Sequence, residues 1–224
     1  SDGLNHLPRI TTPILMLNGE QDYLIPKVVA ERFYDQIGTA AENKRIVFYE
    51  SGHVLGAVSP LITSGGRKIL YSGDLHFEDQ SIIRGALLPQ SGIDVLILEC
   101  TRGESPRDPE YTRWSEGQRL AASIEQCLSR DGSVMLPLFA MGKTQEIVTL
   151  LHDLQLAGQL REMPFHVGGL SVKMTGIYDR FTNRVRRNHR GMHMMRTKGL
   201  LITPGRRGEM PELTGGNIYA LSSG

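Results

Sequence analysis

Short apolar runs alternate with helix-spaced segments along most of this 224-residue chain, and that alternation constrains the fold more than any other feature. It predicts the α/β class with a largely buried sheet. Strands are predicted at residues 14–17, 45–49, 54–62, 68–72, 93–98, 134–138, 200–203 and 218–221, and residues 165–169 are expected to end another. Helices are predicted at residues 27–37, 116–128, 142–156 and 171–181.

Three of these strands have further features in their sequences. Gly65 and Gly66 separate residues 54–62 from residues 68–72, which predicts a hairpin. Residues 93–98 are a run of mostly branched apolar residues, a pattern typical of a strand covered on both faces.

Composition excludes some classes of protein. No apolar run reaches the roughly 18 residues that span a bilayer, so we expect no membrane partner. Cys100 and Cys127 are the two cysteines, which is too few for a disulfide framework and favours a reducing cytoplasm. Both are expected to be buried small apolar residues.

The last segment of the chain is strongly basic. Residues 180–224 hold nine Lys or Arg and only two Asp or Glu. Such a stretch could neutralise the phosphates of RNA or another single-stranded nucleic acid, and a solvated helix face is the alternative. The candidate nucleic-acid-binding residues are Arg184, Arg186, Arg187 and Arg190.

His53 and Asp74 are the side chains best suited to carry chemistry. Each lies beside a predicted strand and follows a glycine, which allows close approach of a ligand. Imidazole nitrogen and carboxylate oxygen both suit zinc or manganese, and an aspartate between two metal ions can help them activate a water. From the residue types alone, structural roles remain the alternative.

Four blocks resemble the β-CASP metallo-β-lactamase nucleases. They keep the order and spacing of that family over about 95 residues. The blocks are GHVLGA at 52–57, GGRKILYSGDL at 65–75, DVLILECTRG at 94–103 and GSVMLPLFAMGKTQE at 132–146. The resemblance covers residues 52–224 or so and implies part of an αββα sandwich with part of an inserted α/β β-CASP domain.

This resemblance also implies a set of roles. His53 and Asp74 would be metal ligands, and Asp74 and Glu99 would be the catalytic residues, with Glu99 as the acidic residue that supports the site. The intact family holds two zinc ions, manganese being the alternative, and acts mainly on RNA as a phosphodiesterase.

The chain departs from the family pattern at both ends. The first ligand cluster, His-x-His-x-Asp-His, does not occur in these 224 residues. The later histidine motifs would follow a segment like residues 217–224, so we interpret the chain as the middle of the family. Structural and catalytic zinc sites need at least three protein ligands, so whether this chain is itself an enzyme stays open.

The N-terminal residues resemble a different family. TPILMLNGEQD at 12–22 is similar to a late strand of the α/β-hydrolase fold, and residues 10–53 or so follow that pattern. By this likeness Asp22 would orient His53 as a catalytic dyad, although no Gly-x-Ser-x-Gly elbow supplies a nucleophile. The simplest interpretation is a fusion with an α/β-hydrolase-like segment at 1–52, a partial metallo-β-lactamase core at 53–103 and a partial β-CASP domain at 104–224.

Three functions therefore remain as hypotheses. The first is a metal-dependent RNA phosphodiesterase represented by an incomplete chain. The second is a serine-hydrolase remnant that uses Asp22 and His53, and the third is an inactive nucleic-acid-binding module. A homo-oligomeric state is left open.

Overall fold

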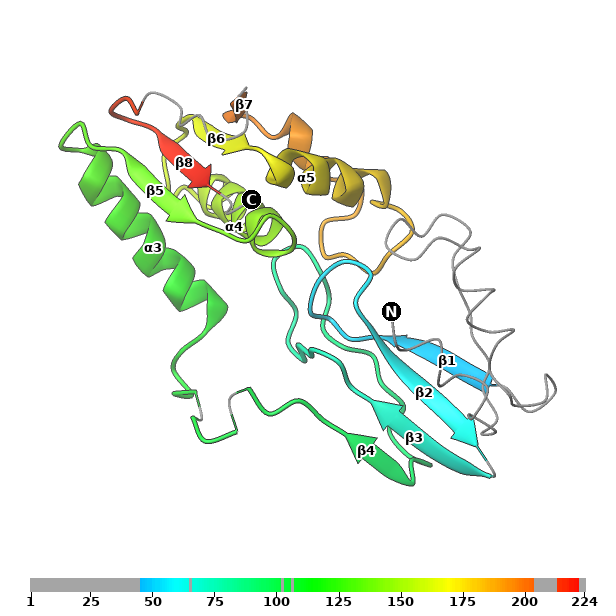
Figure 1. The fold of residues 1–224 in the computed structure, drawn as a ribbon. Helices are drawn as coiled ribbons and strands as arrows, with labels where there is room; N and C mark the ends of the chain where they lie inside the picture. Colours follow the sequence, from blue (N-terminus) through cyan, green and yellow to red (C-terminus); the bar gives the residue numbers. More distant parts are fainter. Residues whose placement is uncertain (1–44, 65, 102, 106, 204–212, 222–224) are drawn as a thin grey trace, which may run out of the picture. The chain divides into compact units, whose positions relative to one another are not determined.

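A computed structural model describes residues 45–64, 66–101, 103–105, 107–203 and 213–221 (Figure 1). The chain divides into two units. The first unit comprises Ser1–Gly52, Gly56–Phe77 and Gly85–Thr101, and the second comprises His53–Leu55, Glu78–Arg84 and Arg102–Gly224. The strand predicted at 14–17 and the helix predicted at 27–37 lie outside the described residues. The division at residues 52 and 103 stays a prediction.

A four-stranded sheet forms the described part of the first unit (Figure 1). Its strands follow the order of the chain: β1 (Arg45–Glu50), β2 (Val58–Ser64), β3 (Arg67–Tyr71) and β4 (Val95–Ile97). The first three pair antiparallel, whereas β3 and β4 run parallel. The carboxyl ends of β3 and β4 therefore meet at one edge of the sheet.

The predicted hairpin is confirmed. Ser64 pairs with Arg67, the closing pair of the antiparallel strands β2 and β3. Leu61 lies opposite Leu70, and both side chains are buried. Opposed apolar side chains of this kind set the register, because a slip by one residue would turn them to the other face.

Three expectations for this unit were wrong. Strand β2 begins at Val58 rather than residue 54, because the N–H of Ser51 donates to the carbonyl of Ala57 (3.1 Å) and closes a loop before the strand. Strand β4 is not covered on both faces: it pairs only with β3 among the described strands, and its side chains are all exposed. Cys100 is also exposed rather than buried, and Cys127, which belongs to the second unit, is half-buried rather than buried.

The second unit contains a parallel sheet in the order β5-β8-β6-β7. Its strands are β5 (Val134–Pro137), β6 (Phe165–Gly168), β7 (Leu200–Thr203) and β8 (Ile218–Leu221), all close to the predicted positions. The last strand of the chain thus lies between β5 and β6 (Figure 1). The predicted α/β class is confirmed.

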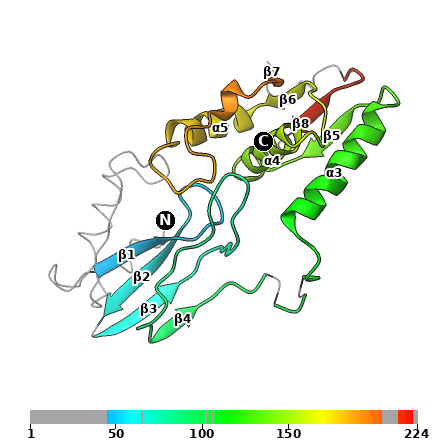
Figure 2. The same cartoon turned by 180° about the vertical axis from the view of Figure 1, so that it is seen from behind.

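Three helices accompany this sheet: α3 (Arg113–Leu128), α4 (Lys143–Leu156) and α5 (Leu170–Arg180), together with the short 3-10 helix η3 (Met194–Arg196). Helix α3 runs beside β5 in both views (Figure 2). It begins three residues before its predicted start because Thr112 and Ser115 form a reciprocal capping box. None of the helices in the described part of the chain is long and apolar enough to cross a membrane.

The core of the second unit includes residues from earlier in the chain. Ile82 is 1% exposed and packs in one cluster with Ile124, Leu154 and Ile218. Residues 53–55 and 78–84 therefore belong to this unit, although the sequence places them among the strands of the first.

Candidate functional site

Asp74 and Glu99 lie just past the carboxyl ends of the parallel strands β3 and β4. The N–H of Leu75 donates to Glu99 Oε1 (2.6 Å), and the N–H of Glu99 donates to Ser72 Oγ (3.0 Å). The hydroxyl of Thr101 donates to the second oxygen of the same carboxylate (2.5 Å). Glu99 therefore fixes the bend that carries Asp74, while the Asp74 side chain is exposed.

His53 belongs to the second unit, and its residue is exposed. Its carbonyl accepts a hydrogen bond from Gln80 Nε2 (2.9 Å). Asp74 and Glu99 thus lie in the first unit, linked through the backbone of Leu75, whereas His53 lies in the second unit. That the three residues form one functional site stays a prediction. Asp22, the other member of the hydrolase-like dyad, lies outside the described residues, and that dyad also stays a prediction.

We tested whether the side chains could hold a metal ion. In the part of the chain that the structure describes, no group of three or more His, Cys, Asp or Glu side chains is placed to bind one. Since zinc sites in proteins use at least three protein ligands, the described residues do not complete a metal site by themselves.

The basic segment divides into exposed and buried arginines. Arg184 and Arg190 are exposed, and Arg186 is half-buried. Arg187 is only 4% exposed, which leaves little of it available to a nucleic acid, and its assignment to a nucleic-acid surface stays a prediction. Its guanidinium donates to the Tyr178 carbonyl (3.1 Å), the Thr182 hydroxyl (3.0 Å) and the Met192 carbonyl (3.2 Å). Burial also lowers the pKa of Arg187.

A buried carboxylate was missed in the sequence. Glu146 on α4 is 3% exposed and accepts hydrogen bonds from the N–H groups of Ser81 (2.8 Å) and Ile82 (3.2 Å). Arg113 of α3 donates to it as well. The one available signal was an acidic residue on the helix face that also carries buried apolar residues, which is rare unless the charge is paired.

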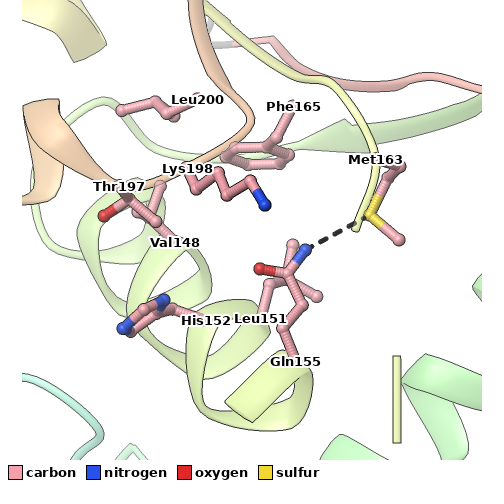
Figure 3. A pocket seen from close by; sticks show the side chains of 9 residues that line it. All are labelled: Val148, Leu151, His152, Gln155, Met163, Phe165, Thr197, Lys198 and Leu200. Atoms are coloured by element: carbon pink, nitrogen blue, oxygen red, sulfur yellow. Dashed lines mark hydrogen bonds between the residues drawn. The ribbon is translucent and has the colours of Figure 1, made fainter. Parts of the chain in front are cut away.

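A small hollow lies in the second unit (Figure 3). It is lined by Val148, Leu151, His152, Gln155, Met163, Phe165, Thr197, Lys198 and Leu200. Its lining is mostly apolar, and the Gln155 amide donates to the Met163 sulfur (3.6 Å). None of the predicted site residues lines it, so it is not the candidate site.

The chain was compared with known proteins. No family model matches it. It is 34% identical over 142 residues to an RNase J-like protein of Methanocaldococcus jannaschii, which covers 63% of this chain and 34% of that protein. It is 33% identical over 141 residues to the cleavage and polyadenylation specificity factor subunit 3 of Dictyostelium discoideum, covering 62% and 18%. It is also 32% identical over 157 residues to the endoribonuclease YSH1 of Mycosarcoma maydis, covering 69% and 17%.

The chain thus spans about a third of the first relative and less than a fifth of the other two. All three are β-CASP metallo-β-lactamase nucleases, whose members depend on metal ions. The described mixed sheet, parallel sheet and three helices agree with part of that architecture. On these matches, the homologues of this chain are β-CASP metallo-β-lactamase nucleases, and the chain is similar to part of them.

Proposed function

We propose that this chain is part of a metal-dependent phosphodiesterase that cleaves RNA. The observation that carries the proposal is its 32–34% identity to an RNase J-like protein and an endoribonuclease over about two thirds of its length. Chemistry of this kind needs carboxylates held in place, and Glu99 holds the bend that carries Asp74 through its bond to Leu75.

His53 and Asp74 are the proposed metal ligands, with zinc as the proposed ion and manganese as the alternative. Both residues are exposed, which leaves them accessible to a ligand. Asp74 and Glu99 are the proposed catalytic residues, with Glu99 as the acidic residue that supports the site. A cytoplasmic location and self-association remain predictions.

Replacing Asp74 with asparagine is expected to lower RNA cleavage by more than about a hundredfold, because even a residue that only orients a metal ligand contributes roughly 10–100-fold. Cleavage of a 5′-labelled single-stranded RNA, with zinc or manganese added, measures the effect. Asp79→Asn is the matched control: its carboxylate is an exposed partner of Arg84 and has no proposed role. Equal loss in the two variants would refute the assignment of Asp74.

Arg184 and Arg190 are the proposed phosphate contacts, since both are exposed. Replacing both with alanine is expected to weaken RNA binding and to reduce the slope of log affinity against log salt by about 1.4, at about 0.7 per contact on a single strand. Fluorescence anisotropy at several salt concentrations measures that slope. Arg161→Ala is the control, because this guanidinium already pairs with Glu125 (3.2 Å). A slope unchanged in the double variant would argue against this interface.

A second candidate function is an inactive nucleic-acid-binding module. It is favoured by one observation, that the described residues contain no group of three metal-binding side chains. Salt-dependent RNA binding without cleavage, unaffected by Asp74→Asn, would select this function over the nuclease.

A further inference from the structure

The three residues that begin with His53 are held by contacts at consecutive positions. The carbonyl of His53 accepts from Gln80 Nε2 (2.9 Å). The N–H of Leu55 donates to the hydroxyl of Tyr178 (3.0 Å). Both partners are side chains of the second unit. The two hydrogen bonds hold the backbone at the residue before Val54 and at the residue after it.

Val54 is fixed by packing against Gly142, at the start of α4. The backbone of Gly142 has φ +85°, and a Cβ atom at this position would lie 2.4 Å from Val54 Cγ1. A side chain here would therefore force Val54 to move. The close approach brings the beginning of α4 directly against the segment that carries His53.

The two side chains that grip this segment are themselves anchored. Gln80 is 8% exposed, and its carbonyl accepts from Asn188 Nδ2 (2.6 Å). Its chain neighbour Ser81 donates its N–H to the buried carboxylate of Glu146. Tyr178 is 2% exposed, and burial raises its pKa to about 12.

We propose that Gln80 and Tyr178 are positioning residues that set the place of the His53 imidazole, an inference that rests on the proposed function of this site. Neither side chain is a proposed metal ligand or catalytic acid. They act through the backbone of residues 53–55, which lies between two strands and carries the exposed histidine. A loop held at consecutive positions loses less conformational entropy when its side chain engages a ligand.

NMR of the 224-residue chain tests the proposal without requiring activity. Tyr178→Phe removes a single hydroxyl, and Gln80→Met removes the amide donor from a side chain of similar size. We expect the ring signals of His53, assigned with His53→Gln, to shift in both variants. The amide of Leu55 is expected to exchange about fivefold faster in Tyr178→Phe, as for one lost hydrogen bond.

Tyr219→Phe is the matched control. Tyr219 is also 2% exposed, and its hydroxyl also accepts a backbone N–H at 3.0 Å, from Thr214. Tyr219→Phe therefore removes an equally buried hydroxyl that also accepts a backbone N–H, but one donated by Thr214 rather than by Leu55. Unchanged His53 and Leu55 signals in Tyr178→Phe, as in this control, would overturn the proposal. If Tyr178→Phe fails to fold, the His53 signals in Gln80→Met decide in the same way.

An RNA cleavage assay distinguishes a failure of the proposed nuclease function from a failure of the positioning role of Gln80 and Tyr178. Where the wild-type chain cleaves RNA, both positioning variants are expected to lower turnover about tenfold at unchanged RNA affinity, as orientation is lost but binding is kept. A wild-type chain that does not cleave RNA would count against the proposed function. The His53 signals would still decide whether Gln80 and Tyr178 position this residue.

Discussion

Replacing Glu146 with glutamine is expected to destabilise the second unit by about 2–4 kcal/mol. The carboxylate is almost fully buried and receives two backbone N–H groups and the guanidinium of Arg113. Glutamine has nearly the same shape but removes the charge and turns an NH₂ group toward donors. The expected cost stays below that of a fully buried ion pair because the Arg113 side chain is 31% exposed and keeps some contact with water.

Denaturant unfolding followed by circular dichroism measures this loss. Glu116→Gln is the control, because Glu116 pairs with Arg119 on the surface of α3 at 2.8 Å and such pairs contribute at most about 1 kcal/mol. Equal shifts in the two variants would show that the buried carboxylate does not hold α3, α4 and residues 81–82 together. A larger loss in Glu146→Gln would support that role.

Replacing Gly52 with alanine is expected to destabilise the first unit by about 3 kcal/mol or more. Gly52 has φ +72°, and an added Cβ would lie 2.3 Å from the His76 carbonyl oxygen and 2.5 Å from the Ala86 nitrogen. Both atoms belong to the backbone, and the Ala86 N–H donates to that same His76 carbonyl (2.8 Å). The clash therefore cannot be relieved by turning a side chain.

Gly56→Ala separates the clash from the cost of the backbone conformation. Gly56 has φ +81° with no atom within 4 Å of the added Cβ, so its replacement is expected to cost only about 1–2 kcal/mol. Hydrogen exchange of the β2 and β3 amides reports the stability of the first unit in each variant. Protection that falls equally in both would show that the close approach at Gly52 adds nothing to the strain.

Local periodicity was sufficient to predict the elements of the second unit. Helix α4 places Val148, Leu151 and Leu154 at helical spacing, and all three are buried. The order of the strands could not be predicted in the same way. Strand β8 comes last in the chain but lies between β5 and β6, and pairing over such distances in sequence leaves no periodic signal.

Burial of charge was equally hard to predict from neighbours in the chain. Arg184, Arg187 and Arg190 lie at regular spacing in one basic stretch, yet only Arg187 is buried. The difference comes from the oxygen atoms of Tyr178, Thr182 and Met192, which accept hydrogen bonds from the two terminal nitrogens of its guanidinium. A buried cation needs such partners, and composition alone does not reveal them.

The sequence by itself determined the α/β class, the hairpin at its two glycines and the motifs that identify the β-CASP family. Each of these depends on residues close together in the chain. Only the tertiary structure decided how the candidate site is supported: Glu99 holds the bend at Asp74, while Gln80 and Tyr178 hold the backbone at His53 and Leu55. The last two bonds join residues 27 and 123 positions apart, so they form only when the folded chain brings those residues together.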